Sequence, residues 1–135
     1  MNSGFEDCIL FDDAIERFEG DIHNAITNFS KERRIDADAI SELARINFVE
    51  MRDWVSEESF LTKKKISAWL FEQYPNNFIP VYSMVSFSHI PYRKALDEHH
   101  KQTKMLDEIY SALEEKHQFK NETTRGIFSK YYDLT

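Results

Sequence analysis

Glycine and proline are scarce in this chain of 135 residues, which contains three of each. Because these two residues dominate tight turns and flexible linkers, their scarcity predicts few turns and no low-complexity segment. A turn that cradles a dinucleotide needs glycines at G-x-G-x-x-G spacing, whereas Gly4, Gly20 and Gly126 lie far apart. The chain therefore lacks the means to form such a turn by itself.

Cysteine and long apolar runs are also nearly absent. Cys8 is the single cysteine, so no internal disulfide can form, which suits a reducing compartment. No stretch approaches the roughly 18 uninterrupted apolar residues that span a bilayer, and the N-terminus lacks the basic and apolar pattern of a signal peptide. These features predict a cytoplasmic protein with no membrane partner.

Positive charge is in deficit, with 17 Lys and Arg against 24 Asp and Glu and a formal net charge of −7. A negative surface repels phosphate backbones, so we expect no nucleic acid as a partner. The two basic runs, 31–34 and 63–65, are short enough to be solvated helix faces.

Apolar side chains are plentiful, since 41% of the residues are hydrophobic and 14% are aromatic. In the first part of the chain they recur with the 3.6-residue period of a helix. The pattern predicts an amphipathic helix in which Cys8 is a small buried residue. The predicted buried stripe consists of Cys8, Phe11, Ile15 and Phe18.

Capping residues and prolines predict where further helices begin and end. Asp21 is expected to cap a second helix that ends near Ser30, and Asp36 is expected to cap the next one. A last long helix with Pro91 in its first turn is expected to end near Lys116.

The segment 78–88 differs from the rest because β-branched and aromatic residues alternate with serine in it. It is predicted to be extended, although Pro80 argues against a central strand. The fold class is therefore mainly α, with one extended segment near 78–88. We divide the chain into residues 1–30, residues 31–116 and a C-terminal tail, 117–135.

Three segments share their order and spacing with a known family of enzymes: 1–8 (MNSGFEDC), 47–52 (NFVEMR) and 79–88 (IPVYSMVSFS). The first is typical of the wide class of flavin-dependent aromatic hydroxylases, and the other two together are more specific. From Met1 to about Leu113 the chain resembles the kynurenine 3-monooxygenases. The resemblance implies a helical C-terminal part of such a flavin-dependent aromatic hydroxylase.

The first segment is where the resemblance places the flavin, beneath which it opens a long helix in the family. Met1 and Asn2 are then the expected contacts of the FAD, and 1–30 is the part that abuts it. Free N–H groups and a partial positive charge at a helix N-terminus would stabilise the negative charge of a reduced flavin. The residues alone leave open another interpretation, in which Asn2 is an ordinary helix cap.

The second and third segments are where the resemblance places the substrate. It implies that Asn47 binds the polar end of kynurenine, that Glu50 and Met51 form the adjacent wall, and that Tyr82 contacts the substrate. The first three lie at i, i+3 and i+4, on one helix face. From the residues alone, Asn47 and Glu50 are instead core groups with hydrogen-bond partners, and Tyr82 is a core residue.

The resemblance implies an FAD-dependent, NADPH-using monooxygenase that hydroxylates L-kynurenine to 3-hydroxykynurenine in tryptophan degradation, with 31–116 on the substrate side. The glycine-rich turns and the groups that clamp the substrate carboxylate have no counterpart here. We therefore expect a fragment without catalytic residues, inactive unless it is joined to the missing flavin-binding part. No C-terminal membrane anchor follows, as in the soluble bacterial members, which favours a cytoplasmic location.

Two alternatives stay open. The chain is a non-catalytic helical subunit or interaction module if its apolar faces bind a different partner. A metal site is suggested by the cluster of Asp97, Glu98, His99 and His100. Adjacent histidines point about 100° apart on a helix, so a solvated helix face is favoured there and no metal is expected.

Overall fold

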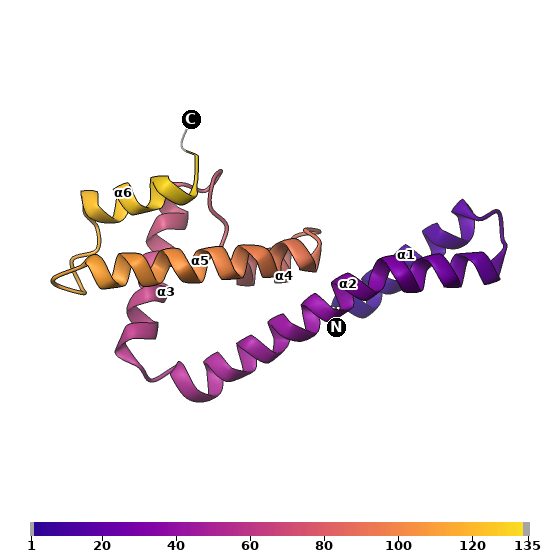
Figure 1. Cartoon of the computed structure of the whole chain (residues 1–135), viewed down its shortest axis with the longest axis horizontal. Helices are drawn as coiled ribbons and strands as arrows, with labels where there is room; N and C mark the ends of the chain where they lie inside the picture. The colour runs from indigo at the N-terminus through magenta and orange to yellow at the C-terminus, as the bar shows by residue number, and fades with distance from the viewer. Residues whose placement is uncertain (1, 134–135) are drawn as a thin grey trace.

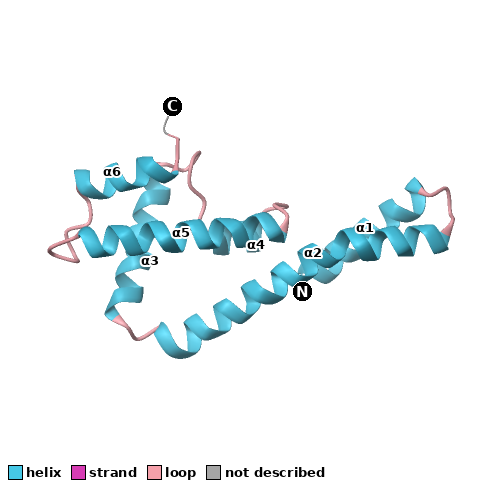
Figure 2. Cartoon of the chain, in the orientation of Figure 1, coloured by secondary structure: helices cyan, strands magenta, loops and turns pink. Residues whose placement is uncertain are grey.

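The chain is helical throughout the part that its structure, a computed structural model, describes: residues 2–133, with side chains from position 4 onward. Figure 2 shows helices joined by loops and no strand in this range. The elements are α1 (Asn2–Arg17), α2 (Ile22–Val49), a short π-helix η1 (Glu50–Trp54), α3 (Glu58–Gln73), α4 (Val81–Phe87), α5 (Tyr92–Ala112) and α6 (Glu122–Tyr131). The predicted mainly helical fold class is confirmed.

The helices form two parts of different shape. α1 and α2 make an antiparallel hairpin that extends away from the remaining helices (Figure 1). Helix α2 runs from the hairpin turn back past the start of α5 and leads through η1 into α3. Helices α3, α4 and α6 each pack on α5. Helix α5 is thus the element that joins the two parts.

The turn between α1 and α2 forms where capping chemistry predicts it. The Asp21 side chain accepts a hydrogen bond from the backbone N–H of Asn24 at 3.1 Å, which satisfies one of the free donors of the α2 N-terminus. Glu19 and Gly20 both have positive φ, at 52° and 83°, and glycine adopts that conformation without strain. The predicted cap at Asp21 is confirmed.

Helix α2 does not end near Ser30, as the sequence had suggested, but continues to Val49. No glycine or proline interrupts the segment between these residues, so nothing in the backbone forces an end. Asp36, which was expected to cap a new helix, lies in the middle of α2. Its carboxylate instead accepts a hydrogen bond from the backbone N–H of Arg93, at the start of α5, at 3.0 Å.

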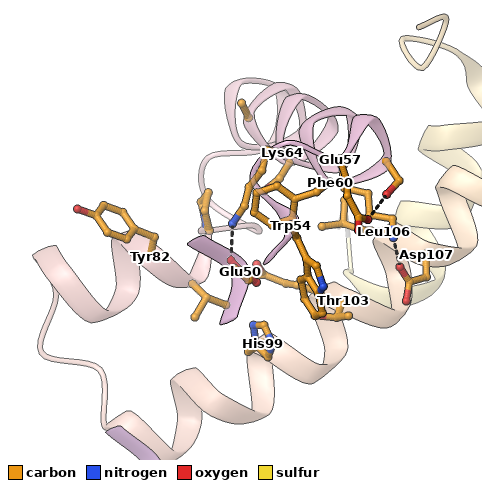
Figure 3. A pocket seen from close by; sticks show the side chains of 17 residues that line it. Glu50, Trp54, Glu57, Phe60, Lys64, Tyr82, His99, Thr103, Leu106 and Asp107 are labelled. Atoms are coloured by element: carbon orange, nitrogen blue, oxygen red, sulfur yellow. Dashed lines mark hydrogen bonds and ion pairs between the residues drawn. The ribbon is translucent and has the colours of Figure 1, made fainter. Parts of the chain in front are cut away.

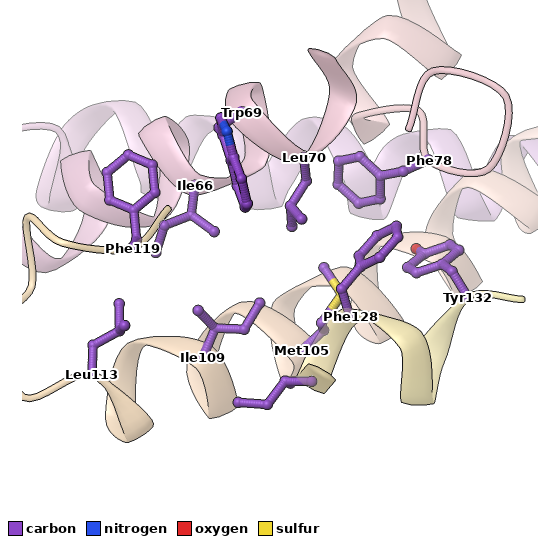
Figure 4. Close-up of a cluster of buried hydrophobic side chains, with 11 residues drawn as sticks. Ile66, Trp69, Leu70, Phe78, Met105, Ile109, Leu113, Phe119, Phe128 and Tyr132 are labelled. Atoms are coloured by element: carbon purple, nitrogen blue, oxygen red, sulfur yellow. The ribbon is translucent and has the colours of Figure 1, made fainter. Parts of the chain in front are cut away.

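The larger hydrophobic core lies between α3, α5 and α6 (Figure 4). The Phe128 ring stacks on Tyr74 with 4.7 Å between centroids and meets the edge of Phe78 at 5.8 Å. Such aromatic pairs add to the free energy that burial of their area provides. The buried members of the cluster are Ile66, Trp69, Leu70, Phe78, Met105, Ile109, Leu113, Phe119, Ile127, Phe128 and Tyr132.

Helix α6 forms within the predicted C-terminal tail and has a complete N-terminal cap. The Asn121 side chain accepts from the backbone N–H of Thr124 at 2.9 Å, and Glu122 places negative charge in the first turn. Ile127 and Phe128 are buried on the face toward α5. The described part of the tail, up to position 133, therefore contributes to the core.

The prediction of an extended segment over 78–88 is wrong for most of its length. Only the residues around Phe78 to Pro80 and the turn from Ser88 onward are non-helical, and 81–87 form α4. The Pro80 carbonyl accepts from the backbone N–H groups of Ser83 and Met84. Burial of Met84 against Leu43 and Ala95 favours the helix, since strand propensity depends on a neighbouring strand and none occurs among residues 2–133.

The prediction that Cys8 is buried is also wrong, because its side chain is exposed. The face of α1 that meets α2 centres on Ala14, which is fully buried, and on Phe11, whose ring meets Phe29 edge-on at 5.3 Å. Phe11, Ile15 and Phe18 of the predicted stripe are partly buried, whereas Cys8 is not and Ala14 takes the most buried place on this face.

We predict that Phe128→Ala lowers the free energy of unfolding by about 3–5 kcal/mol, since it removes a buried ring and leaves a cavity. The measurement is urea unfolding followed by circular dichroism. The matched control is Phe87→Ala, which truncates a ring that is 79% exposed and should change the free energy little. Equal losses in the two variants would contradict this description of the core.

Candidate functional site

A cavity of about 450 Å³ opens between η1, α3, the start of α4 and α5. Aromatic and aliphatic side chains line it together with charged and hydroxyl groups (Figure 3). This combination is typical of a small-molecule site, in which apolar walls give contact area and a few polar groups fix orientation. The residues that line it include Glu50, Trp54, Phe60, Lys63, Lys64, Tyr82, His99, Gln102, Leu106 and Asp107.

The backbone changes its winding where it reaches this cavity. Helix α2 passes directly into η1, a π-helix from Glu50 to Trp54. π-Helical turns are rare and are frequent at functional sites, because the wider turn redirects side chains. Here both end residues of η1, Glu50 and Trp54, line the cavity.

Glu50 is one of three acidic groups that line the cavity, with Glu57 and Asp107, and it is paired with a cation from α3. The Glu50 Oε2 atom lies 3.2 Å from Lys64 Nζ, and the side chains are 17% and 56% exposed, respectively. Lys64 also lies over the Phe60 ring at 4.9 Å. Because the lysine is mostly solvated, the pair adds little stability. Its main effect is to hold the Glu50 carboxylate in one place.

His99, on α5, is the titratable group opposite that ion pair. Its partial burial is the main cause that lowers its pKa below the ordinary value of 6.5, with further lowering by His100 and Lys64. The negative charges of Glu50 and Glu42 act in the opposite direction. The imidazole is therefore neutral at neutral pH and presents one hydrogen-bond donor and one acceptor.

Two polar contacts fix the walls of the cavity. Gln102 is buried, and its Nε2 atom donates to the backbone oxygen of Ile79 at 2.8 Å, which ties α5 to the segment that precedes α4. Lys63 Nζ and Asp107 Oδ1 lie 2.6 Å apart between α3 and α5. Of the elements that frame the cavity, α3 and α5 are also held together by the larger hydrophobic core.

The structure brings together two of the substrate residues that the resemblance implies. Glu50 and Tyr82 both line the cavity, although they come from η1 and α4. The Tyr82 side chain is 68% exposed and points away from Glu50 and His99 (Figure 3). Its ring packs edge-on against Phe87, with centroids 6.2 Å apart.

The other predicted substrate residues lie outside the cavity lining. Asn47 is exposed on the last turns of α2, and Met51 is 60% exposed. Asn47 belongs to α2, whereas Glu50 and Met51 are the first two residues of the π-helix η1. In this chain Asn47 and Met51 face solvent, and their role in binding stays a prediction.

The two expected flavin contacts fall at the edge of the described range. Met1 lies outside it, and for Asn2 only the backbone, the first residue of α1, is described. Among the described residues, no group of three or more His, Cys, Asp or Glu side chains is arranged to hold a metal ion.

Sequence reasoning missed Trp54, Lys64 and Gln102 as parts of the site. Lys64 belongs to a basic run that we interpreted as a solvated face, and His99 was considered only as a metal ligand. None of them carries a local signal, since each reaches the cavity through packing of α3, η1 or α5.

Residues 2–133 include no helix with the length and apolar character needed to cross a membrane.

The chain is similar to several curated proteins that share one name, whereas no family model matches it. Among curated proteins, it is similar to kynurenine 3-monooxygenase from Caenorhabditis briggsae (37% identical over 110 residues, 82% of this chain and 24% of that protein). The enzymes of the same name from Sus scrofa (43% over 96 residues, 71% and 20%) and Cytophaga hutchinsonii (43% over 110 residues, 81% and 24%) are also similar. The chain spans about a quarter of the length of these relatives, or less.

We predict opposite shifts of the His99 pKa in two cavity variants. Lys64→Met removes a cation that lowers this pKa and should raise it, whereas Glu50→Gln removes an anion that raises it and should lower it further. The measurement is a pH titration of the imidazole signals by NMR. A His99 pKa at or above 6.5 in the unaltered chain, or no response to either change, would contradict the described environment.

The same shift predicts a pH dependence of folding. Because the folded chain holds His99 with a lowered pKa, the unfolded chain binds more protons as the pH falls through about 6.5. The contribution of His99 to stability is therefore present at pH 7.5 and is lost on acidification. Urea midpoints compared between pH 7.5 and pH 5.5 should fall less in His99→Asn than in the unaltered chain, and an equal or larger fall would refute this.

Proposed function

Because the chain is homologous to kynurenine 3-monooxygenases over about four-fifths of its length, we propose that it forms part of an FAD-dependent, NADPH-using monooxygenase. The complete enzyme hydroxylates L-kynurenine to 3-hydroxykynurenine, a step in tryptophan degradation. In this proposal the chain contributes one wall of the substrate pocket, is inactive by itself and acts in the cytoplasm.

The observation that carries the proposal is the identity of 37–43% to enzymes of that name over most of the chain. The cavity adds independent support. It joins Glu50 and Tyr82, from the two segments that carry the resemblance, in a space of about 450 Å³, a size suited to a small molecule. Its apolar wall of Trp54, Phe60 and Leu106 suits an aromatic ring.

The flavin itself does not fit within the described residues alone. They contain no strand, so they lack the strand–turn–helix unit that holds a dinucleotide. What residues 2–133 offer is the N-terminal turn of α1, which can face one edge of such a group. In the proposed complete enzyme, bound FAD would supply the oxygen transfer, and the unit that holds its dinucleotide part would come from outside residues 2–133.

The residues of this chain have positioning and shielding roles in that reaction. The Glu50 carboxylate, held by Lys64, attracts the ammonium end of the substrate, while the neutral His99 offers a directional hydrogen bond. Tyr82, which is largely exposed, is free to turn its hydroxyl toward a bound ligand. The aromatic wall excludes water from the ring that is hydroxylated.

The apolar side chains exposed on α1 and around η1 support the requirement for a missing part. Phe5 and Ile9 are 68% and 64% exposed, and Phe48 and Met51 are 60% exposed. Clusters of exposed apolar residues mark surfaces that another protein part covers. These surfaces also favour the second candidate, a non-catalytic helical module that binds a different protein.

A chimaeric enzyme separates the two candidates. We predict that the Cytophaga hutchinsonii relative keeps its activity when this chain replaces the matching 110 residues. L-kynurenine should stimulate NADPH oxidation and yield 3-hydroxykynurenine, quantified by chromatography. A folded chimaera that binds FAD yet forms no product would refute the proposal and leave the interaction module as the better account. The isolated chain should form no product even with added FAD and NADPH.

Within the active chimaera, Tyr82→Phe should raise the KM for L-kynurenine about 5- to 30-fold, the cost of losing a hydrogen bond of about 1–2 kcal/mol. The matched control is Tyr110→Phe, which alters a tyrosine outside the cavity lining and should leave the KM unchanged. Equal KM values in both variants and the parent would remove Tyr82 from the site.

A further inference from the structure

Arg33, in the middle of α2, holds a cluster of charged groups drawn from three helices. Its Nη2 atom lies 2.7 Å from Glu6 Oε2 and its Nε atom 2.5 Å from Asp7 Oδ1, both on the first turns of α1. Its guanidinium lies over the ring of Tyr92, the first residue of α5, with 5.4 Å from Cζ to the ring centroid. The Arg33 side chain is only 10% exposed.

Burial and charge act in opposite directions on Arg33, and its carboxylate partners decide the balance. Burial acts to lower the pKa of Arg33, but hydrogen bonds and charge from Glu6 and Asp7 outweigh it, so the pKa is raised. Burial raises the pKa of the Tyr92 hydroxyl, and the charge of Glu6 raises it further. A buried guanidinium that loses its carboxylates is strongly destabilised, so α1 is held where Glu6 and Asp7 reach Arg33.

The same cluster also fixes the start of α5. Pro91 precedes that helix and offers no side-chain cap, so the free N–H groups of its first turn need another partner. The Asp36 carboxylate supplies it, with Oδ1 accepting from Arg93 N at 3.0 Å and Oδ2 lying 3.7 Å from Arg33 Nη1. A residue of α2 therefore caps α5, and Arg33 holds that residue from the other side.

We propose that Arg33 is a positioning residue that sets the N-terminal turn of α1 relative to α5. In the proposed function, on which this inference rests, the cluster fixes the flavin-facing end of α1 against the helix that carries His99 and Gln102 of the substrate cavity. The hairpin otherwise extends away from the α3–α6 part (Figure 1). Arginine is required because its planar fork bonds two carboxylates at once while stacking on Tyr92, which a lysine cannot do.

The position of α1 is measurable in this chain itself, without flavin or substrate. Cys8 is an exposed free thiol on α1, and Lys94→Cys adds a second exposed one on α5. Spin labels at the two sites report the α1–α5 distance by pulsed electron resonance. We expect a single narrow peak in the parent, loss of that peak in Arg33→Met, and a partly broadened peak in Arg33→Lys.

The matched control is Arg45→Met, which removes an exposed arginine that also bonds a carboxylate on α2, that of Glu42. It should leave the distance peak unchanged. If Arg33→Met does not fold, Glu6→Gln, which keeps the guanidinium and the Asp7 contact, provides the same test. An unchanged narrow peak in the folded Arg33 or Glu6 variants, with only a lower melting temperature, would overturn the proposal and leave Arg33 a stabilising residue alone.

A second measurement in the chimaera tests the functional consequence. Arg33→Met should reduce the 3-hydroxykynurenine formed per NADPH consumed, with hydrogen peroxide making up the difference, while Arg45→Met should not. An unchanged product yield would overturn the functional half of the proposal. A chimaera inactive in every form would refute the proposed function, whereas the distance measurement would still decide the role of Arg33.

Discussion

The packing of α5 against its neighbours is the interaction on which the rest of the structure depends. One face of α5 enters the aromatic core with α3 and α6 through Met105 and Ile109. Helix α5 also lines the cavity, through residues that include His99 and Gln102. Its first turn is capped by Asp36 from α2. A loss of this packing would therefore disturb the cavity walls and the junction with the hairpin together.

Local sequence signals predicted those features that local chemistry decides. The cap at Asp21 follows from a carboxylate beside free N–H groups, and the helical class follows from apolar spacing. Features decided by distant contacts were missed. The alternation within 81–87 indicated extended backbone, but packing of Met84 against Leu43 favours a helix. Asp36 caps α5 through a hydrogen bond from Arg93, 57 positions away in the sequence, and such a contact leaves no local signal.

The residues of the candidate site show the same difference between those that a sequence signal indicates and those that only packing brings together. Glu50 and Tyr82 were found through the resemblance, and the structure brings both to one cavity. Lys64 and Gln102 could not be found, since a lysine in a basic run and a glutamine on a helix have no distinguishing pattern until α3 and α5 pack together. Arg33 is a similar case, because its partners Glu6 and Asp7 lie far away in the sequence.

The most direct test of this account is amide hydrogen exchange in the isolated chain, which reports local opening free energies. If one core positions the cavity, the slowest amides should lie in α3 and α5, and the amide of Met84 in α4 should share their protection. Helix α1, whose main contacts are with α2, should exchange faster. Exchange in α5 as fast as in α1 would contradict the account, because the cavity walls would then have no stable frame.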